Sequence, residues 1–292
     1  MTEPRVIAAE EPKGLTFPTY RMLIDRQCAE EEMALANERL IAASAGAPLG
    51  EVLGLDPYTG KPFANGGFGR QQRTMNFAHI KLEGVMYSRD TWYRASVSRV
   101  VAALREAYED PDIDGVLLEV NTGGGEVTAG QMMASAIKDR PKPVVAFAHY
   151  AASGGIMATM HADEVVASGT TARFGSIGVY TTIDKWLIDY YSRYYKEVYS
   201  DLSPDKNEAY REFQTKGTVD KFKEELNEIA RAFQAEVVAA RNLPKATREN
   251  TLRGGTWLAE ESKRRGLIDS IGSFQYALTR LADIAAFTNN SN

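Results

Sequence analysis

The sequence predicts an α/β protein with a mainly parallel, twisted sheet that is flanked by helices, and with an N-terminal helical extension. Three observations support this fold class. Short apolar runs alternate with segments of helical periodicity from about residue 74 onward, and two glycine-rich turns directly follow buried strands. The 292 residues are also 44% hydrophobic and 25% charged, and these ordinary globular proportions exclude a disordered or fibrous protein.

The first elements of the sheet region are identified by their apolar patterns. Residues 78–85 alternate between apolar and polar side chains, as in a half-buried strand. Residues 96–108 carry valine, leucine and alanine at helical spacing. The compact apolar run 114–120 is typical of a strand covered on both faces. A helix at 128–138 and a second buried strand at 143–148 follow.

The later elements continue the alternation and then become helical. We expect a helix rich in small residues at 153–160, and short strands at 164–167 and 176–180. Strands that alternate with helices indicate a mainly parallel sheet with right-handed crossovers. Beyond residue 215 the pattern becomes helical, with helices expected at about 219–242, 258–265 and 274–285.

The chain divides into three parts by composition. Residues 1–72 form the N-terminal extension, with an expected amphipathic helix at about 19–44 and a linker rich in glycine and proline at 45–72. Residues 73–283 form the α/β domain. Residues 284–292 are expected to be a polar tail with frayed structure.

The charged and sulfur-containing residues exclude several classes of function. The net charge of −5, without a basic run, argues against a nucleic-acid partner. The single cysteine, Cys28, excludes an internal disulfide and a cysteine-rich zinc site, and three histidines leave few ways to bind a metal. We therefore expect no cofactor and no metal. No apolar run is long enough for a membrane span, so we expect no membrane partner.

Two glycine-rich turns are the strongest candidates for chemistry. They are Asn-Thr-Gly-Gly-Gly at 121–125 and Ala-Ala-Ser-Gly-Gly at 151–155, and in a parallel sheet both should face the same crevice. Glycine lets backbone N–H groups approach a substrate closely. Neither turn has the spacing of a nucleotide-binding loop. Ser153 is therefore a candidate nucleophile, although a serine at this position is also a common helix N-cap.

These turns resemble the signature blocks of the signal peptide peptidase A family, the serine peptidases of family S49 in clan SK. The resemblance covers about residues 75–283 and includes Phe-Gly-Ser-Ile-Gly-Val at 174–179, Gly-Thr-Trp-Leu-Ala at 255–259 and Gly-Leu-Ile-Asp-Ser-Ile-Gly at 266–272. It implies a ClpP/crotonase-like fold and a serine endopeptidase with a Ser-Lys dyad.

A serine nucleophile needs a base, and the chain offers one downstream histidine. His161 is eight residues after Ser153, too close along one helix to face it, so it is interpreted as structural. The resemblance implies a lysine about fifty residues after the serine and just past a strand. Residues 197–199 would be that strand, which points to Lys206. The segment from Ser200 to Lys206 is longer than the Ser-Gly-x-x-Lys pattern of the family and lacks its glycine. Lys196 and Lys185 therefore remain alternative candidates for the base.

The resemblance also implies supporting groups for the dyad. A hydroxyl in the Gly-Ser-Ile-Gly block orients the family lysine, and here that position is Ser176. The oxyanion hole is expected from the backbone N–H groups of Gly154 and of Gly124 or Gly125, with Gly125 favoured by its place in the motif.

Within the family, the N-terminal helix and linker resemble the layout of bacteriophage capsid assembly (prohead maturation) proteases. That implies a polypeptide substrate such as scaffold, portal or the chain itself, a homo-oligomer, and a location in the cytoplasm or in a procapsid assembled there. A soluble bacterial relative that degrades peptides is an alternative, as are a crotonase-type acyl-CoA enzyme and an inactive assembly component on the same fold.

Overall fold

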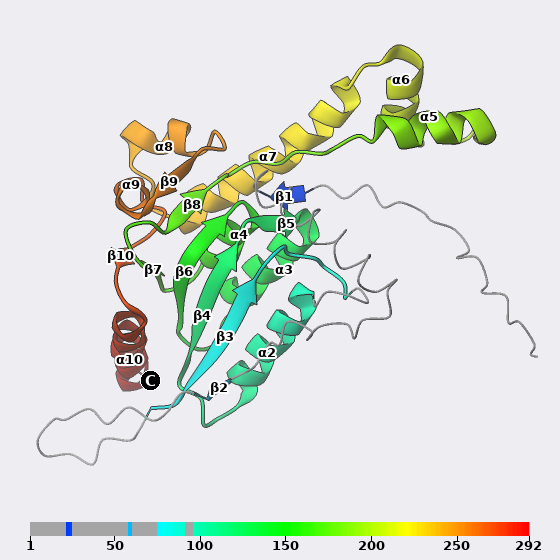
Figure 1. Ribbon diagram of the computed structural model, residues 1–292. Coiled ribbons are helices and arrows are strands. Elements are labelled where there is room, and N and C mark those ends of the chain that lie inside the picture. Colours follow the sequence, from blue (N-terminus) through cyan, green and yellow to red (C-terminus); the bar gives the residue numbers. More distant parts are fainter. Residues whose placement is uncertain (1–21, 25–57, 60–74, 91–95, 292) are drawn as a thin grey trace, which may run out of the picture.

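The structure is a computed structural model that describes residues 22–24, 58–59, 75–90 and 96–291 (Figure 1). The strands are β1 Met22–Ile24, β2 Tyr58–Thr59, β3 Phe77–Glu83, β4 Gly115–Thr122, β5 Gly124–Glu126, β6 Val144–Ala152, β7 Glu164–Ala167, β8 Arg173–Gly175, β9 Thr256–Leu258 and β10 Ser270–Ile271. The helices are α2 Val97–Glu109, α3 Val127–Lys138, α4 Gly154–Thr159, α5 Lys185–Tyr194, α6 Glu208–Lys216, α7 Asp220–Ala240, α8 Lys245–Thr251, α9 Ala259–Arg264 and α10 Phe274–Ser291.

The main sheet has the order β10-β7-β6-β4-β3-β2, and β8 and β9 extend it beside β6. The pairs among β3, β4, β6, β7 and β10 are parallel, as is the pair β6–β8. Strands β2 and β9 add antiparallel edges. The α/β class with a mainly parallel sheet flanked by helices is therefore confirmed.

Two hydrophobic clusters cover the two faces of the sheet. Because side chains alternate along a strand, Val116 and Leu118 of β4 face α2, α3 and α4, whereas Leu117 faces the other side. On that side α10 packs its Ala277, Leu281 and Ala285 (Figure 1). All of these side chains are buried, which explains why the central strands read as continuous apolar runs.

Helices α5, α6 and α7 form an arm that projects from the body of the protein (Figure 1). Near its C-terminal end, α7 buries Phe233 and Val237 in the main core. Near its other end, Phe222 packs edge-on against Tyr210 of α6, with ring centroids 5.0 Å apart. Because α7 has 21 residues, it spans about 30 Å. Helices α5 and α6 are therefore held away from the sheet.

Four local predictions were wrong. Residues 22–24 are a strand rather than part of a helix, because they pair with β5; the rest of 19–44 lies outside the described residues. The strand expected at 176–180 is instead β8 at 173–175, followed by irregular backbone that turns at Ser176. Residues 197–199 are not a strand. Helix α10 continues to Ser291 through the expected polar tail, because Ala285 is still packed against the sheet.

Among the described residues, no helix is both long and apolar enough to cross a lipid bilayer.

Candidate active site

Ser153 is at the junction between β6 and α4, in a strained backbone conformation. Its φ and ψ angles are 54° and −113°, a region that residues other than glycine rarely adopt. Its N–H donates to the carbonyl of Gly175 at 2.8 Å. Its hydroxyl makes no capping hydrogen bond to the helix, and instead donates to the carbonyl of Gly178 at 3.4 Å. The N-cap interpretation is therefore not supported.

Ser176 lies beside Ser153 because the strands that precede them are paired. Ala152 of β6 and Gly175 of β8 are register partners, and each serine follows directly. Ser176 also has a φ of 54°, and its N–H donates to the carbonyl of Gly255 at 2.7 Å. The structure thus brings together the nucleophile candidate and the hydroxyl that was expected to orient the base.

The first glycine-rich turn packs directly against the start of α4. A Cβ atom on Gly154 would lie 3.3 Å from Cα of Gly124 and 3.4 Å from the backbone nitrogen of Gly125. The glycine at 154 therefore allows an approach that a larger residue would prevent. Gly124, Gly125 and Gly154 form one wall of the site, beside Ser153.

The hydrogen bonds of this turn distinguish the two candidate oxyanion donors. Buried Thr122 accepts a hydrogen bond from the N–H of Gly124 at 3.0 Å, and its hydroxyl donates to the carbonyl of Gly84 at 2.5 Å. The N–H of Gly124 thus already has a hydrogen-bond acceptor. The carbonyl of Gly124 and the N–H of Glu126 pair with the backbone of Met86, at 2.8 and 2.9 Å. These contacts leave the N–H of Gly125 pointing the other way, because successive peptide groups of a strand alternate in direction.

Met86 is a contributor that sequence reasoning missed. A Cβ atom on Gly125 would lie 2.0 Å from the carbonyl oxygen of Met86, so only glycine fits there. Met86 is buried and forms an isolated parallel bridge with Gly125. No sequence motif identifies Met86, because it contributes its backbone N–H and carbonyl, which almost any residue type could supply. The expected strand at 78–85 ends one residue before it.

Within the described residues, none of the three candidate lysines hydrogen-bonds to Ser153. Lys206 is exposed and lies between α5 and α6 in the arm, where its N–H donates to the carbonyl of Ser203 at 3.2 Å. Lys185 begins α5 and Lys196 follows it, and both are also exposed. In Figure 1, α5 and α6 lie in the arm, away from α4 and β5. Lys185 is the first residue of α5, and Lys196 and Lys206 lie between α5 and α6. The only partner recorded for the Ser153 hydroxyl within the described residues is the carbonyl of Gly178.

His161 takes part in the packing of α4 against α7 rather than in the site. Its Nε2 is 3.1 Å from a carboxylate oxygen of Glu236 on α7. This contact agrees with the structural interpretation of His161.

A second polar cluster lies on the sheet face that α10 covers. Glu119 of β4 accepts hydrogen bonds from Nε2 of His79 at 2.7 Å and from Nε2 of His149 at 2.9 Å, and Nζ of Lys81 is 3.9 Å away. Burial alone would raise the pKa of Glu119. The hydrogen bonds from the two histidines and the charge of Lys81 outweigh burial, so the pKa lies below its ordinary value.

No group of three or more His, Cys, Asp or Glu side chains within the described ranges is placed to hold a metal ion.

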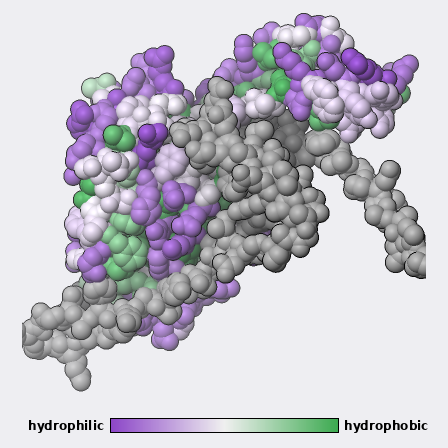
Figure 2. Space-filling model, in the orientation of Figure 1, coloured by the Kyte–Doolittle hydropathy of each residue, from purple (hydrophilic) through white to green (hydrophobic). Residues whose placement is uncertain are grey.

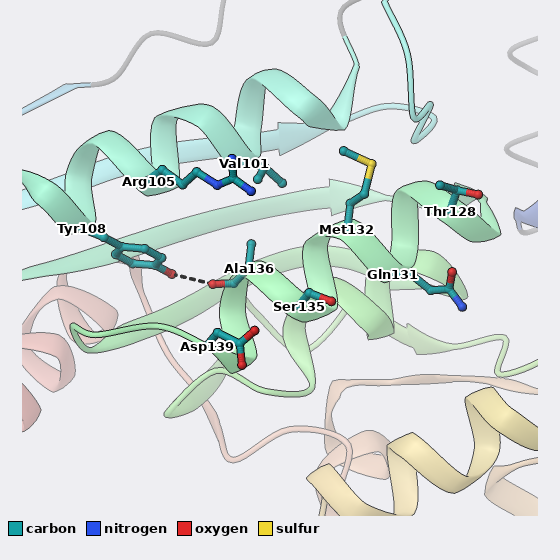
Figure 3. A pocket seen from close by; sticks show the side chains of 9 residues that line it. All are labelled: Val101, Arg105, Tyr108, Thr128, Gln131, Met132, Ser135, Ala136 and Asp139. Carbon is teal, nitrogen blue, oxygen red and sulfur yellow. Dashed lines mark hydrogen bonds between the residues drawn. The ribbon is translucent and has the colours of Figure 1, made fainter.

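A surface pocket of about 490 Å³ lies between α2 and α3, apart from the glycine-rich turns (Figure 3). The hydroxyl of Tyr108 donates to the carbonyl of Ala136 at 3.2 Å along its wall. Burial raises the pKa of Tyr108. None of the predicted site residues lines this pocket.

Comparison with known proteins gives one family. The sequence profile of peptidase family S49 matches residues 136–288, more than half of the chain. Protease 4 of Salmonella typhi is 28% identical over 191 residues, which are 62% of this chain and 30% of that protein. A protein named as a protease from Methanocaldococcus jannaschii is 30% identical over 195 residues, 64% of this chain and 61% of that one. The chain thus spans less than a third of Protease 4.

Among solved structures, an enoyl-CoA hydratase/isomerase family protein from Silicibacter pomeroyi matches with 15% identity and a TM-score of 0.42. The match covers 72% of this chain and 77% of that one.

Proposed function

Because this chain belongs to peptidase family S49, we propose that it is a serine endopeptidase whose nucleophile is Ser153 and whose general base is Lys206. One observation carries the proposal. Ser153 is held in a strained conformation at a strand–helix junction, against a wall of glycines from which backbone N–H groups can reach a substrate. Strained residues of this kind gather at active sites.

The proposed chemistry is acyl transfer. Oγ of Ser153 bonds to the carbonyl carbon of the scissile peptide while its proton passes to the neutral amine of Lys206. The N–H groups of Gly125 and Gly154 donate to the oxygen that becomes negatively charged. The lysine returns the proton to the departing amine, and water then hydrolyses the acyl-enzyme by the same steps. An ordinary lysine has a pKa of about 10.4, so the assembled site must disfavour its charged form.

We propose that a second copy of the chain completes the site. Lys206 lies in the projecting arm, and α5 and α6 bury none of their residues. On α5, Trp186 stacks on Tyr190 with ring centroids 5.6 Å apart, and the ring centroids of Tyr190 and Tyr194 are 4.9 Å apart.

Trp186 and Tyr194 are 71% and 70% exposed. Figure 2 shows pale and green patches between hydrophilic side chains on this arm. Exposed aromatic ladders are typical of protein interfaces. We therefore propose a homo-oligomer in which the arm of one copy carries Lys206 to Ser153 of its neighbour.

The physiological substrate in this proposal is a capsid assembly protein, either scaffold, portal or the chain itself. This part rests on the layout of the N-terminal region in the sequence. Its test is the processing of capsid proteins in procapsids that contain Ser153→Ala, where we expect scaffold and portal to remain uncut. Normal processing in that variant would exclude this role.

The enzymatic proposal is tested by covalent labelling with a fluorophosphonate, read by intact mass between pH 6 and 9. We expect wild type to label, and Ser153→Ala and Lys206→Ala to fail. Lys196→Ala and Lys185→Ala are the matched controls, because both lysines are exposed in the same arm and should label like wild type. Labelling of Lys206→Ala at the wild-type rate would exclude Lys206 as the base.

A mixing experiment tests where the base comes from. Ser153→Ala retains the lysine and Lys206→Ala retains the serine, so neither variant alone should cleave a peptide substrate. If the lysine comes from a second copy, a random equal mixture should recover about a quarter of the wild-type activity, because one site in four then combines an intact serine with an intact lysine. A mixture of co-refolded chains that remains inactive would contradict this arrangement.

A further inference from the structure

Strand β1 lies along the glycine-rich strand of the candidate active site. Residues Met22–Ile24 pair antiparallel with Gly124–Glu126, and Leu23 is the register partner of Gly125 (Figure 1). The two paired strands are about a hundred positions apart in the sequence. A three-residue strand therefore joins the N-terminal region to the wall of the site.

The direction of the peptide groups makes this pairing relevant to catalysis. The backbone of Met86 occupies one edge of β5 by binding the carbonyl of Gly124 and the N–H of Glu126. The N–H and carbonyl of Gly125 then face the opposite edge, where β1 lies. The N–H assigned above to the oxyanion hole is thus directed at Leu23.

An extended polypeptide substrate binds most simply by adding a strand to an exposed sheet edge, because its backbone then supplies the hydrogen bonds. The available edge of β5 is the one that β1 already covers. We propose that residues 22–24 occupy the place of the substrate strand, so that the protein inhibits itself and a substrate must displace β1. This inference rests on the proposed peptidase function.

Two proline substitutions test the inference in the full-length chain. Leu23→Pro removes the N–H that faces Gly125, and proline in a paired strand removes a ladder hydrogen bond. Ile24→Pro is the matched control, because the N–H of the next residue points away from β5 and an edge strand tolerates its loss.

The first measurement does not depend on activity. Both prolines are placed in the Ser153→Ala background, and hydrogen–deuterium exchange is followed at residues 124–126. We expect Leu23→Pro to accelerate exchange of the Gly125 amide, and Ile24→Pro to leave it close to the parent protein. Equal exchange in all three proteins would overturn the pairing itself.

The second measurement is peptide cleavage by the variants with an intact serine. Because β1 would compete with substrate, Leu23→Pro should lower KM by about fivefold or more at unchanged kcat, while Ile24→Pro resembles wild type. If all three proteins cleave with one KM, self-inhibition is wrong although the peptidase proposal stands. If none cleaves or labels, the peptidase proposal fails, and the self-inhibition that rests on it fails too.

Discussion

Ser153 and Ser176 end two paired parallel strands at the same level: each directly follows one member of the register pair Ala152 and Gly175, and each has a φ of 54°. The carbonyl of Gly175 accepts the N–H of Ser153 at 2.8 Å, so the two turns are joined through their backbones. The register of the two strands places the two hydroxyl-bearing residues at one end of the sheet. This relationship leads to the first prediction.

Replacing Ser153 by glycine should give a more stable protein than replacing it by alanine. The left-handed conformation costs a residue with a Cβ about 1–3 kcal/mol, and glycine avoids this cost while losing about 0.5–1 kcal/mol through greater freedom in the unfolded chain. We expect Ser153→Gly to exceed Ser153→Ala by about 1 kcal/mol in free energy of unfolding, measured in urea. Both variants lack the hydroxyl, so the comparison does not involve catalysis. Equal stability would mean that the turn is not strained.

Gly125→Ala should abolish most of the activity. The added methyl group would lie 2.0 Å from the carbonyl oxygen of Met86, so β5 must move and carry the N–H of Gly125 with it. Loss of one oxyanion donor lowers the rate on the order of 10²–10³-fold. Gly169→Ala is the control, because nothing lies within 4 Å of its added Cβ. Peptide cleavage and thermal unfolding should be measured together, and wild-type cleavage by a folded Gly125→Ala would rule out this donor.

Removing the exposed aromatic side chains of α5 should weaken assembly without unfolding the protein. Trp186→Ser combined with Tyr194→Ser removes the two most exposed rings of the ladder, and we expect association to weaken about tenfold or more. Sedimentation velocity measures the association and peptide cleavage the consequence. Phe287→Ser on α10 is the comparison, because Phe287 is 76% exposed but lies outside the arm. An equal effect of both changes would show that the arm is not the interface.

The stability contributed by Glu119 should depend on pH in the acidic range. The pKa of Glu119 is lower in the folded protein than in the unfolded chain. At pH values between these two pKa values the unfolded chain binds more protons, so stability rises with pH. The contribution is complete above the ordinary glutamate pKa of about 4.3 and disappears as pH falls through the lower folded value.

Glu119→Gln should therefore lose stability at neutral pH and approach wild type in acid, as measured by urea unfolding across pH 2–7. Glu83→Gln, at the exposed end of β3, provides the control and should follow the wild-type curve. A constant difference between Glu119→Gln and wild type at every pH would contradict the effect.

Much of the fold was predictable because buried positions in the central strands require apolar residues, which form a regular sequence pattern. Residues 116–118 and 144–148 are apolar throughout because helices cover both faces of β4 and β6. Strand β1 was not predictable in this way. Residues 22–24 were interpreted as helical from composition, but they are extended because β5, about a hundred residues away, offers an unpaired edge. Long-range pairing of this kind overrides local propensity.

The glycine-rich part of the candidate site was predictable because its chemistry is local. A Cβ would collide with the backbone at Gly125 and would be tightly packed at Gly154, and Gly124 has a φ of 98°, which glycine readily adopts. Glycine-rich turns of this kind are visible in a sequence. Gly125 was favoured over Gly124 by its place in the motif, and the structure adds a physical reason, because the hydroxyl of Thr122 already accepts the N–H of Gly124. The location of the lysine was not predictable at all. It depends on where the arm projects, which spacing along the chain does not encode.

The link between Ser176 and Gly255 has a consequence for biosynthesis. The N–H of Ser176 donates to the carbonyl of Gly255, and β8 is held by β9 at residues 256–258, about eighty positions later in the chain. A ribosome-bound chain that ends before residue 255 therefore lacks a part of the turn next to Ser153. Contacts between such distant residues also form slowly. Catalytic competence should thus arrive only after residue 258 has been synthesised, which would protect the nascent chain and its neighbours on the polysome from premature cleavage.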